Sequence, residues 1–411
     1  MLTLDEALAR LVAGAQAARI DEVEQLSTFD ALGRVLARDV VSSIDVPPAD
    51  NSSMDGYAVR RADVVHAGAV LPQSQRIAAG VVGTPLVVGT VARIFTGAQV
   101  PAGADAIVMQ ERCTAVDGGV RIDRLPEPGE WIRRRGEDVR AGASVLPAGL
   151  RLTPQALGLA AGVGAATLTV LRRPRVALFS TGDELVMPGS VAPEALPPGA
   201  IYNSNRYTLR GLLLAAGCEV SDLGIVPDRL DTTRAALRLA AQAHDLVLTS
   251  GGVSVGEEDH IKPAVAAEGR IEVWQVAIKP GKPLAFGALR AGLQNEREAL
   301  FLGLPGNPVS SFVTFLLAVQ PVLHALQGLP ASLPVSTPMR ADFDWPRPDR
   351  RREFLRVRCN PHGGLDLYPN QSSGVLTSAV WADGLVDNPP EQAIQRGDTV
   401  AYRRLEAWIG R

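Results

Sequence analysis

The chain is 411 residues long, which is too long for a single hydrophobic core and predicts roughly two to four domains. Hydrophobic residues make up 46% and charged residues 21%, so the composition is that of a globular protein and excludes a disordered chain. Lys and Arg number 41 against 44 Asp and Glu, and the net charge of −3 gives no electrostatic footprint for nucleic acid or an anionic membrane. No apolar run is expected to reach transmembrane length. We therefore expect no nucleic-acid partner and no membrane partner.

The N-terminal segment, MLTLDEALARLVAGAQA, spaces its leucines as one face of an amphipathic helix. It lacks the basic stretch and unbroken apolar core of a signal peptide. Three cysteines, Cys113, Cys218 and Cys359, lie too far apart for a zinc pattern or a disulfide framework. We read them as small buried hydrophobic residues, which predicts a reducing, cytoplasmic location.

Residues 46–141 predict a small β domain. Runs such as TPLVVGTVARIFTG and ADAIVMQERCTAV favour strands and alternate with Pro and Gly. Helical periodicity returns near residue 151, with Thr153 as a plausible N-cap and Pro154 in the first helical position. Residues 1–45 and 142–170 are therefore predicted to form one discontinuous helical domain that the β domain interrupts.

Strands and helices alternate over residues 171–328, from the apolar run RVALFSTG to the long apolar helix that follows LPGN. This rhythm predicts a parallel-rich sheet covered by helices on both faces, a three-layer α/β/α domain. Ligands of such domains bind beyond the carboxyl ends of the strands. Residues 329–411, with EFLRVRC, LDLYP and DTVAYRRL, predict a second small β domain.

Two glycine-containing loops at predicted strand ends are candidate anion sites. Small residues let backbone N–H groups approach an anion, and a helix that follows directs its positive end toward it. Plain turn formation and helix capping would need no ligand, so this alternative stays open. The candidate residues are Ser250, Gly251, Gly252 and Ser254 in SGGVSVGEEDH, and Pro305, Gly306 and Asn307 in LPGNPVSS.

Three carboxylates recur at the same predicted edge of the sheet, in FSTGDEL, IVPDRLD and SGGVSVGEEDH. They are Glu184, Asp228 and Asp259. Two carboxylates about 4 Å apart repel by about 4 kcal/mol at an effective dielectric near 20, so a cluster favours a bound cation. Oxygen ligands alone suit Mg²⁺. The loop AIKPGKP adds Lys279 and Lys282, which could hold a phosphate or could be a solvated hairpin.

Two further motifs lie in the predicted β domain. The run IRRRGED contains Arg133, Arg134 and Arg135, which form either a solvated charge run or a fork for an oxyanion. The stretch NSSMDGYAVR (51–60) reads locally as an Asx-type turn that enters a strand. The residues alone thus predict a Mg²⁺-assisted enzyme that acts on a phosphorylated, anionic small molecule.

The motifs taken together resemble the molybdopterin molybdenumtransferase family, which includes the bacterial MoeA proteins and the E domain of gephyrin. The resemblance covers nearly the whole chain and is weakest in the C-terminal β domain. It rests on the order and approximate spacing of DNSSMDGYAVR, RIFTGAQVPAGADAIVMQE, IRRRGEDVRAG, VALFSTGDEL, SGGVSVGEEDH, AIKPGKP and LPGNPVSS.

The resemblance implies a molybdopterin-binding α/β domain, a barrel-like C-terminal β domain and an elongated homodimer whose active site is shared between protomers. It also implies the reaction, in which adenylylated molybdopterin and molybdate give molybdenum cofactor and AMP in the presence of Mg²⁺. Family positions linked to activity fall on Asp55, Thr96, Glu184, Asp228 and Asp259. The substrate cleft of the family falls on Lys279, Lys282, Pro305 and the Gly251–Gly252 turn. The sequence VPDRLD around Asp228 departs from the paired acids expected there.

Two alternatives remain at this point. A molybdopterin adenylyltransferase shares the α/β domain but lacks the flanking domains and NSSMDGYAVR. A scaffold without turnover, like one role of the gephyrin E domain, would not require the acids and lysines. Partners implied by the resemblance are the adenylyltransferase and other proteins of cofactor biosynthesis.

Overall fold

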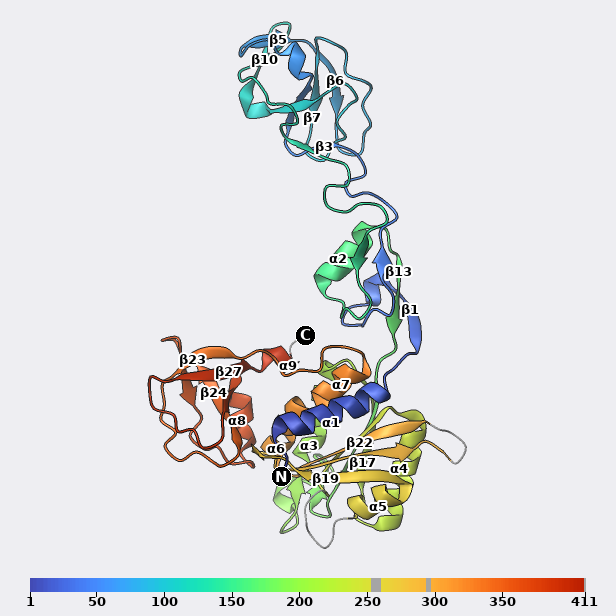
Figure 1. Ribbon diagram of the computed structural model, residues 1–411, viewed down its shortest axis with the longest axis vertical. Coiled ribbons are helices and arrows are strands. Elements are labelled where there is room, and N and C mark those ends of the chain that lie inside the picture. Colours follow the sequence, from blue (N-terminus) through green and yellow to red (C-terminus); the bar gives the residue numbers. More distant parts are fainter. Residues whose placement is uncertain (253–259, 293–296, 410–411) are drawn as a thin grey trace. The chain divides into compact units, whose positions relative to one another are not determined.

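The structure is a computed structural model that describes residues 1–252, 260–292 and 297–409, and the chain divides into two compact units (Figure 1). Unit 1 comprises Met1–Glu24, Gly33–Val35 and Val170–Arg411, and unit 2 comprises Gln25–Leu32 and Leu36–Thr169. This division is coarser than the four predicted domains, whose boundaries stay a prediction. Each unit is described by itself.

A six-stranded sheet forms the centre of unit 1 (Figure 1). Its order is β17 (Glu219–Val226), β14 (Arg175–Thr181), β18 (Leu246–Ser250), β22 (Glu298–Leu304), β21 (Pro283–Arg290) and β19 (Gly269–Gln275). The first four strands are parallel, and β21 and β19 are antiparallel to their neighbours. The sheet is therefore parallel-rich, as predicted.

Helices cover both faces of this sheet because successive side chains of a buried strand point to opposite faces. On β14, Val176 and Leu178 pack in one hydrophobic cluster with α3 (Ser204–Ala215) and the helical stretch α6 (Pro308–Thr314), η5 (Phe315–Val319) and α7 (Gln320–Leu326). Ala177 and Phe179 pack in the other cluster with α4 (Leu230–Ala243) and α5 (Ile261–Glu268). The predicted three-layer α/β/α architecture is confirmed.

The helical stretch Pro308–Leu326 is long and apolar enough to cross a membrane, with a mean hydropathy of 1.7, yet 94% of it is buried inside the protein. We expected no apolar run of this length. The prediction missed this stretch, and its burial makes it a core helix of unit 1. Helix α1 (Leu4–Ala17) packs on α7 and begins at a capping box between Thr3 and Glu6.

The C-terminal strands of unit 1 form a closed five-stranded barrel, as the predicted barrel-like domain required. The strands are β24 (Arg352–Cys359), β25 (Gly364–Leu367), β23 (Thr337–Ala341), β27 (Thr399–Arg404) and β26 (Gly384–Asn388), and β26 pairs back to β24. A short strand of the α/β domain, β20 (Ile278–Lys279), pairs in parallel with β24. The loop that carries the two candidate lysines is thereby attached to the barrel. The shorter helices α8 (Leu376–Trp381) and α9 (Glu406–Ile409) accompany the barrel strands.

Unit 2 is built mainly from short strands, as the predicted β domain required. One sheet has the order β6 (Gln73–Ile77), β7 (Val91–Ile94), β4 (Gly56–Val59) and β8 (Ala106–Met109), and another has the order β5 (Ala69–Leu71), β10 (Gly119–Ile122) and β9 (Cys113–Val116). Smaller pairs are β3 (Asn51–Ser52) with β11 (Ile132–Arg133), and β2 (Val40–Val41) with β12 (Ser144–Leu146). Helix α2 (Pro154–Gly162) begins at the predicted N-cap, where the Thr153 side chain accepts a hydrogen bond from the Ala156 N–H. Strand β1 (Val23–Ser27) pairs with β13 (Thr167–Leu171) where the chain passes between the units.

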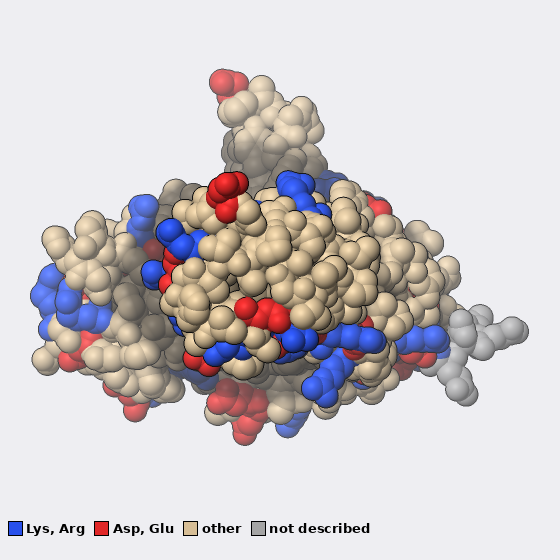
Figure 2. All heavy atoms as spheres, turned by 90° about the horizontal axis from the view of Figure 1, so that it is seen from above, with Lys and Arg blue, Asp and Glu red and all other residues tan. Residues whose placement is uncertain are grey.

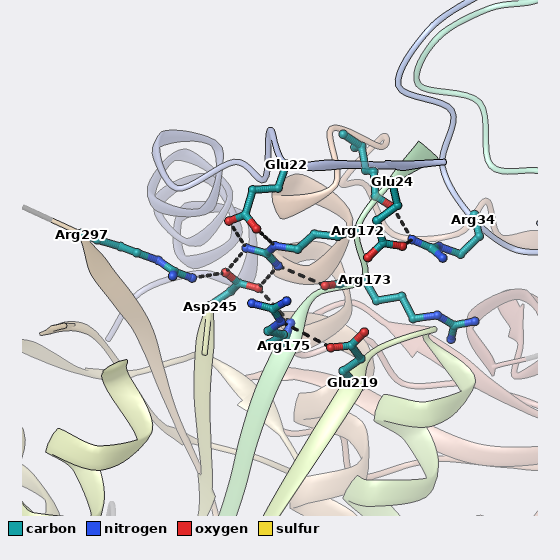
Figure 3. A network of polar contacts seen from close by, with 10 residues as sticks. Glu22, Glu24, Arg34, Arg172, Arg173, Arg175, Glu219, Asp245 and Arg297 are labelled. Carbon is teal, nitrogen blue, oxygen red and sulfur yellow. Dashed lines mark hydrogen bonds and ion pairs between the residues drawn. The ribbon is translucent and has the colours of Figure 1, made fainter. Parts of the chain in front are cut away.

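A buried ion network lies at the amino edge of the unit 1 sheet, where Arg172 precedes β14 and Asp245 precedes β18 (Figure 3). The Arg172 guanidinium lies 2.6 Å from Asp245 Oδ2 and 2.7 Å from Glu22 Oε2. Arg297 Nη2 lies 2.7 Å from Asp245 Oδ1. The side chains of Arg172 and Asp245 are only 5% and 7% exposed. The charges at this edge therefore neutralise one another within the protein.

On the face that Figure 2 draws, Lys and Arg side chains are interspersed with Asp and Glu side chains. Charge of a single sign does not cover this face. The mixture of both signs agrees with the near-neutral composition of the chain.

Candidate functional site

A cavity of about 740 Å³ lies at the carboxyl edge of the parallel strands in unit 1. The loops that follow β14, β17, β18 and β22 reach it, as the general rule for open α/β sheets predicts. The turn between β20 and β21 and two segments of the C-terminal barrel complete its wall. Predicted site residues on this wall are Glu184, Asp228, Ser250, Gly251, Gly252, Lys279, Lys282, Pro305, Gly306 and Asn307.

The turn after β18 needs glycine for two reasons. Gly251 and Gly252 have φ values of +90° and +67°, in the left-handed region that favours glycine. A Cβ on Gly251 would lie 2.7 Å from the carbonyl oxygen of Thr181, which is too close for any side chain. The Gly251 N–H donates to the Leu304 carbonyl at 3.0 Å, which ties this turn to the loop after β22. At this point the cavity is therefore lined by backbone atoms, without side chains that would block a ligand.

The loop after β22 is fixed by its neighbours. Asn205 Nδ2 donates to the Gly306 carbonyl at 2.7 Å, and the Val309 N–H donates to the Ser373 carbonyl at 2.9 Å. Asn307 precedes α6 at the N-cap position, but its side chain makes no capping hydrogen bond. The structure therefore does not support the alternative in which Asn307 serves only to cap the helix.

The two lysines on the cavity wall differ in their surroundings. Lys279 Nζ lies 3.1 Å from Glu353 Oε1 and 3.4 Å from Asp349 Oδ2. Lys282 is exposed, and its ammonium forms no ion pair or hydrogen bond with any residue that the structure describes. Lys282 is thus a cation available to an anionic ligand, whereas Lys279 is held in place by carboxylates of the barrel.

The barrel contributes cavity residues that sequence reasoning missed. They are Arg351, Gln371, Ser372 and Ser373. Arg351 lies between β20 and Asp349, with Nε 2.9 Å from Asp349 Oδ1. The hydrogen bonds that its guanidinium donates to the Asp349 carboxylate raise the pKa of Arg351. The sequence signals for these residues are the basic run RRR at 350–352 and the polar turn QSSG at 371–374. Neither segment contains local information that it reaches a site in another domain.

The predicted carboxylate trio is only partly described. Glu184 and Asp228 both line the cavity, whereas Asp259, like Ser254, lies outside the described residues. In the described part of the chain, no three Asp, Glu, His or Cys side chains are grouped closely enough to hold a metal ion. Glu184 is exposed, and its carboxylate has no hydrogen bond or ion pair among the described residues. Mg²⁺ is often held by only one or two carboxylates together with substrate phosphates, and this donor set fits Glu184 and Asp228.

Asp55 and Thr96 belong to unit 2 and contact each other directly. Asp55 Oδ1 accepts hydrogen bonds from both the backbone N–H and the hydroxyl of Thr96, each at 2.8 Å. These bonds, first the one from the Thr96 N–H, hold the pKa of Asp55 below its usual value. Local sequence shows only a turn here, because Thr96 lies 41 residues away from Asp55.

The three arginines of IRRRGED also lie in unit 2. Arg134 pairs with Asp50 at 2.7 Å, and Arg135 pairs with Asp45 at 2.6 Å. Arg133 lies on β11 and lines a cavity of about 450 Å³ together with Glu137 and Asp138. Two of the three guanidiniums thus have carboxylate partners within unit 2, and the oxyanion fork remains a prediction.

Three family descriptions match nearly the whole chain. Residues 2–164 match the MoeA N-terminal region (domains I and II), residues 177–325 match the probable molybdopterin binding domain, and residues 338–405 match the MoeA C-terminal region (domain IV). The cavity at the carboxyl edge of the sheet lies within the second of these regions and borders the third.

Relatives and solved structures agree with this match. A molybdopterin molybdenumtransferase of Haemophilus influenzae is 43% identical over 329 residues, which cover 80% of this chain and 78% of the relative. Another, of a Nostoc species, is 39% identical over 93% of this chain and 89% of its own length. The crystal structure of the molybdopterin biosynthesis moeA protein from Pyrococcus horikoshii superposes with a TM-score of 0.83 at 28% identity, over 98% of this chain and 99% of that chain.

Proposed function

Because this chain belongs to the molybdopterin molybdenumtransferase family, and so is a transferase of molybdenum cofactor biosynthesis, we propose that it inserts molybdate into adenylylated molybdopterin and releases AMP. The observation that carries this proposal is the cavity at the carboxyl edge of the molybdopterin-binding domain. A glycine turn, a lysine without an ion-pair partner in the described part of the chain, and two carboxylates border it together. Its volume of about 740 Å³ is within the usual range for a cofactor-sized ligand.

The cations on the cavity wall support an anionic substrate. Molybdate is a small tetrahedral dianion, and it needs fixed donors such as lysine, arginine or backbone N–H groups. Lys282 offers an ammonium without an ion-pair partner among the described residues, and Lys279 and Arg351 offer cations that carboxylates of the barrel hold in place. We assign these three side chains to the oxyanions of molybdate and of the phosphoanhydride.

We assign Glu184 and Asp228 to Mg²⁺, since both line the cavity and oxygen ligands suit this ion. Bound there, Mg²⁺ would neutralise charge on phosphate oxygens as the phosphoanhydride opens. Replacing either acid by its amide should weaken the Mg²⁺ dependence of AMP release while the fold is retained. An unchanged Mg²⁺ requirement in both Glu184→Gln and Asp228→Asn would contradict the assignment.

The deciding experiment is to incubate the purified chain with adenylylated molybdopterin, molybdate and Mg²⁺ and to measure AMP. Release of AMP that requires molybdate is the expected result. No release with all three components present would reject the proposed function and favour a scaffold. Formation of adenylylated molybdopterin from molybdopterin and ATP would instead identify an adenylyltransferase.

We also propose a cytoplasmic homodimer in which Asp55 and Thr96 serve the cavity of the partner subunit. The support is that the Asp55–Thr96 pair and Glu184 lie in different units of the chain. Asp55→Ala and Glu184→Ala homodimers should each be nearly inactive. When they are refolded together in equal amounts, roughly a quarter of wild-type activity should return, because half the dimers are mixed and each carries one intact site. Mixed dimers, verified by mass spectrometry, that recover no activity would show that each site is built within one protomer.

A further inference from the structure

Glu353 is a fully buried carboxylate at the edge of the candidate site. It lies on β24 of the barrel, is 0% exposed and faces the cavity lysine Lys279 across the β20–β24 pairing. We propose that Glu353 is a positioning residue that fixes the Lys279 ammonium for anion binding. The inference rests on the proposed function, because it concerns how this site receives molybdate.

The two oxygens of Glu353 have separate partners. Oε1 lies 3.1 Å from Lys279 Nζ. Oε2 accepts hydrogen bonds from Trp345 Nε1 at 2.8 Å and from the Asp349 N–H at 3.1 Å. The two donors on Oε2 hold the carboxylate in one orientation, so Oε1 is directed at the lysine. A buried carboxylate held in this way can act as a fixed anchor for a cation.

The Lys279 ammonium is only partly satisfied by the barrel. It has three N–H donors, and it donates a hydrogen bond to Glu353 Oε1 at 3.1 Å and forms an ion pair with Asp349 Oδ2 at 3.4 Å. The side chain is 37% exposed and lines the cavity. The barrel carboxylates therefore hold Lys279 at the cavity wall while leaving N–H donors available to a ligand.

The charges around Lys279 balance before any ligand binds. Lys279 and Arg351 carry two positive charges, and Asp349 and Glu353 carry two negative charges. Lys282, in contrast, has no ion-pair partner among the described residues. The two lysines thus differ in role, since Lys282 supplies a cation without a carboxylate partner and Lys279 supplies a hydrogen-bond donor that the barrel holds in place.

The substitution Glu353→Gln tests this role with little change in shape. Trp345 Nε1 and the Asp349 N–H both donate to the same oxygen, so the new amide must present its oxygen to them. Its NH₂ group then faces the Lys279 ammonium, donor against donor, and displaces it. We expect molybdate to bind about tenfold more weakly, the size of one lost charge-assisted hydrogen bond.

A double-mutant cycle separates positioning from a general structural effect. The molybdate affinity of the full chain is measured by titration calorimetry for the wild type, Glu353→Gln, Lys279→Met and the double variant. If Glu353 acts through Lys279, Glu353→Gln should have no further effect in the Lys279→Met background. A purely structural role would weaken binding by the same factor in both backgrounds.

Asp387 provides a matched control in the same barrel. It is a buried carboxylate on the neighbouring strand β26, 5% exposed, and it pairs with Arg352 and Arg403 and not with a cavity residue. Asp387→Asn should lower the melting temperature and leave molybdate affinity unchanged. If Glu353→Gln does not fold, the same double-mutant cycle is measured with Glu353→Asp. This substitution should weaken molybdate binding in the wild-type background and should have no further effect in the Lys279→Met background.

Three results would overturn the inference. They are an unchanged molybdate affinity in Glu353→Gln, an equal effect in both lysine backgrounds, and a chain that folds with neither Gln nor Asp at this position. The last would make Glu353 a requirement for the barrel itself. Failure of the proposed function is recognised separately, because the wild type would then neither bind molybdate nor release AMP.

Discussion

The two edges of the unit 1 sheet carry similar residues in opposite arrangements. At the amino edge, Arg172, Asp245, Glu22 and Arg297 form ion pairs with one another (Figure 3). At the carboxyl edge, Lys282 and the carboxylate of Glu184 have no ion pair within the described chain. A cavity adjoins each edge, of about 370 Å³ at the first and about 740 Å³ at the second.

This difference shows that a cluster of charged side chains does not by itself identify a binding site. Charges that satisfy one another need no ligand, and removing one partner leaves the other buried and unpaired, whereas charges left without partners can be satisfied by a ligand. Glycine turns reinforce the contrast, since the carboxyl edge has Gly251 and Gly252 on its wall, where backbone can approach a ligand. Pairing and backbone access together distinguish the candidate site from the structural network.

The largest expected effect comes from breaking the amino-edge network. Arg172→Met leaves the Asp245 carboxylate buried without its main partner, and should lower the free energy of unfolding by about 3 kcal/mol. Chemical denaturation followed by circular dichroism measures this loss, and AMP release per folded chain should be unchanged. Arg175→Met is the matched control, because its pair with Glu219 is exposed and should contribute only about 0.2–1 kcal/mol. If Arg172→Met lowered AMP release by more than the loss of folded protein explains, the amino-edge network would also serve the reaction, and the distinction between the two edges would be wrong.

At the carboxyl edge, Lys282→Ala should have the reverse pattern. The concentration of substrate needed for half-maximal AMP release should rise by about 10- to 100-fold, the range for a hydrogen bond to a charged group. The melting temperature should change little, because no pair is broken. Lys282→Arg keeps the charge and should recover part of the affinity. Equal kinetics of wild type and Lys282→Ala over a salt series would assign this lysine to a solvated hairpin.

Acid titration should weaken the amino-edge network next. The hydrogen bond from Arg172 lowers the pKa of Glu22. Burial raises the pKa of Asp245, but the hydrogen bonds that its carboxylate accepts from Arg172 and from the Arg175 N–H outweigh burial, so the pKa of Asp245 is lowered as well. Depressed carboxyl pKa values stabilise the fold above the unfolded pKa of about 4, and this contribution is lost as pH falls through the folded values. The stability difference between wild type and Arg172→Met should therefore be constant above about pH 5 and shrink below about pH 4. A difference that grows on acidification would contradict the ion-pair origin.

The smallest effect is expected for Arg297→Ala. Arg297 pairs with Asp245 at 2.7 Å, but its side chain is 38% exposed. Exposed partners are screened by water, so the loss of unfolding free energy should be at most about 1 kcal/mol. A loss as large as that of Arg172→Met, seen in the same denaturation experiment, would show that Asp245 depends on both arginines equally.

Much of the fold could be predicted from the sequence because its signals are local. Apolar runs such as RVALFSTG predict buried strands, and Thr153 with Pro154 predicts the start of α2, which the structure confirms. The loops on the cavity wall were predicted for the same reason, since glycine and the ends of strands are visible in the sequence. The expectation that no apolar run reaches transmembrane length was wrong for Pro308–Leu326, because a buried core helix can have the same length and composition as a membrane span.

The pairing of charges was decided only by the tertiary structure. The sequence by itself determined the α/β rhythm, the glycine turns and the presence of lysines and acids near one edge of the sheet. It did not determine that Arg351, Gln371, Ser372 and Ser373 of the barrel complete the cavity. Arg172 and Asp245 lie 73 residues apart in the sequence, and Lys279 and Glu353 lie 74 apart. Local periodicity contains no information at that separation, because such pairs meet only when packing of the apolar faces brings their strands together.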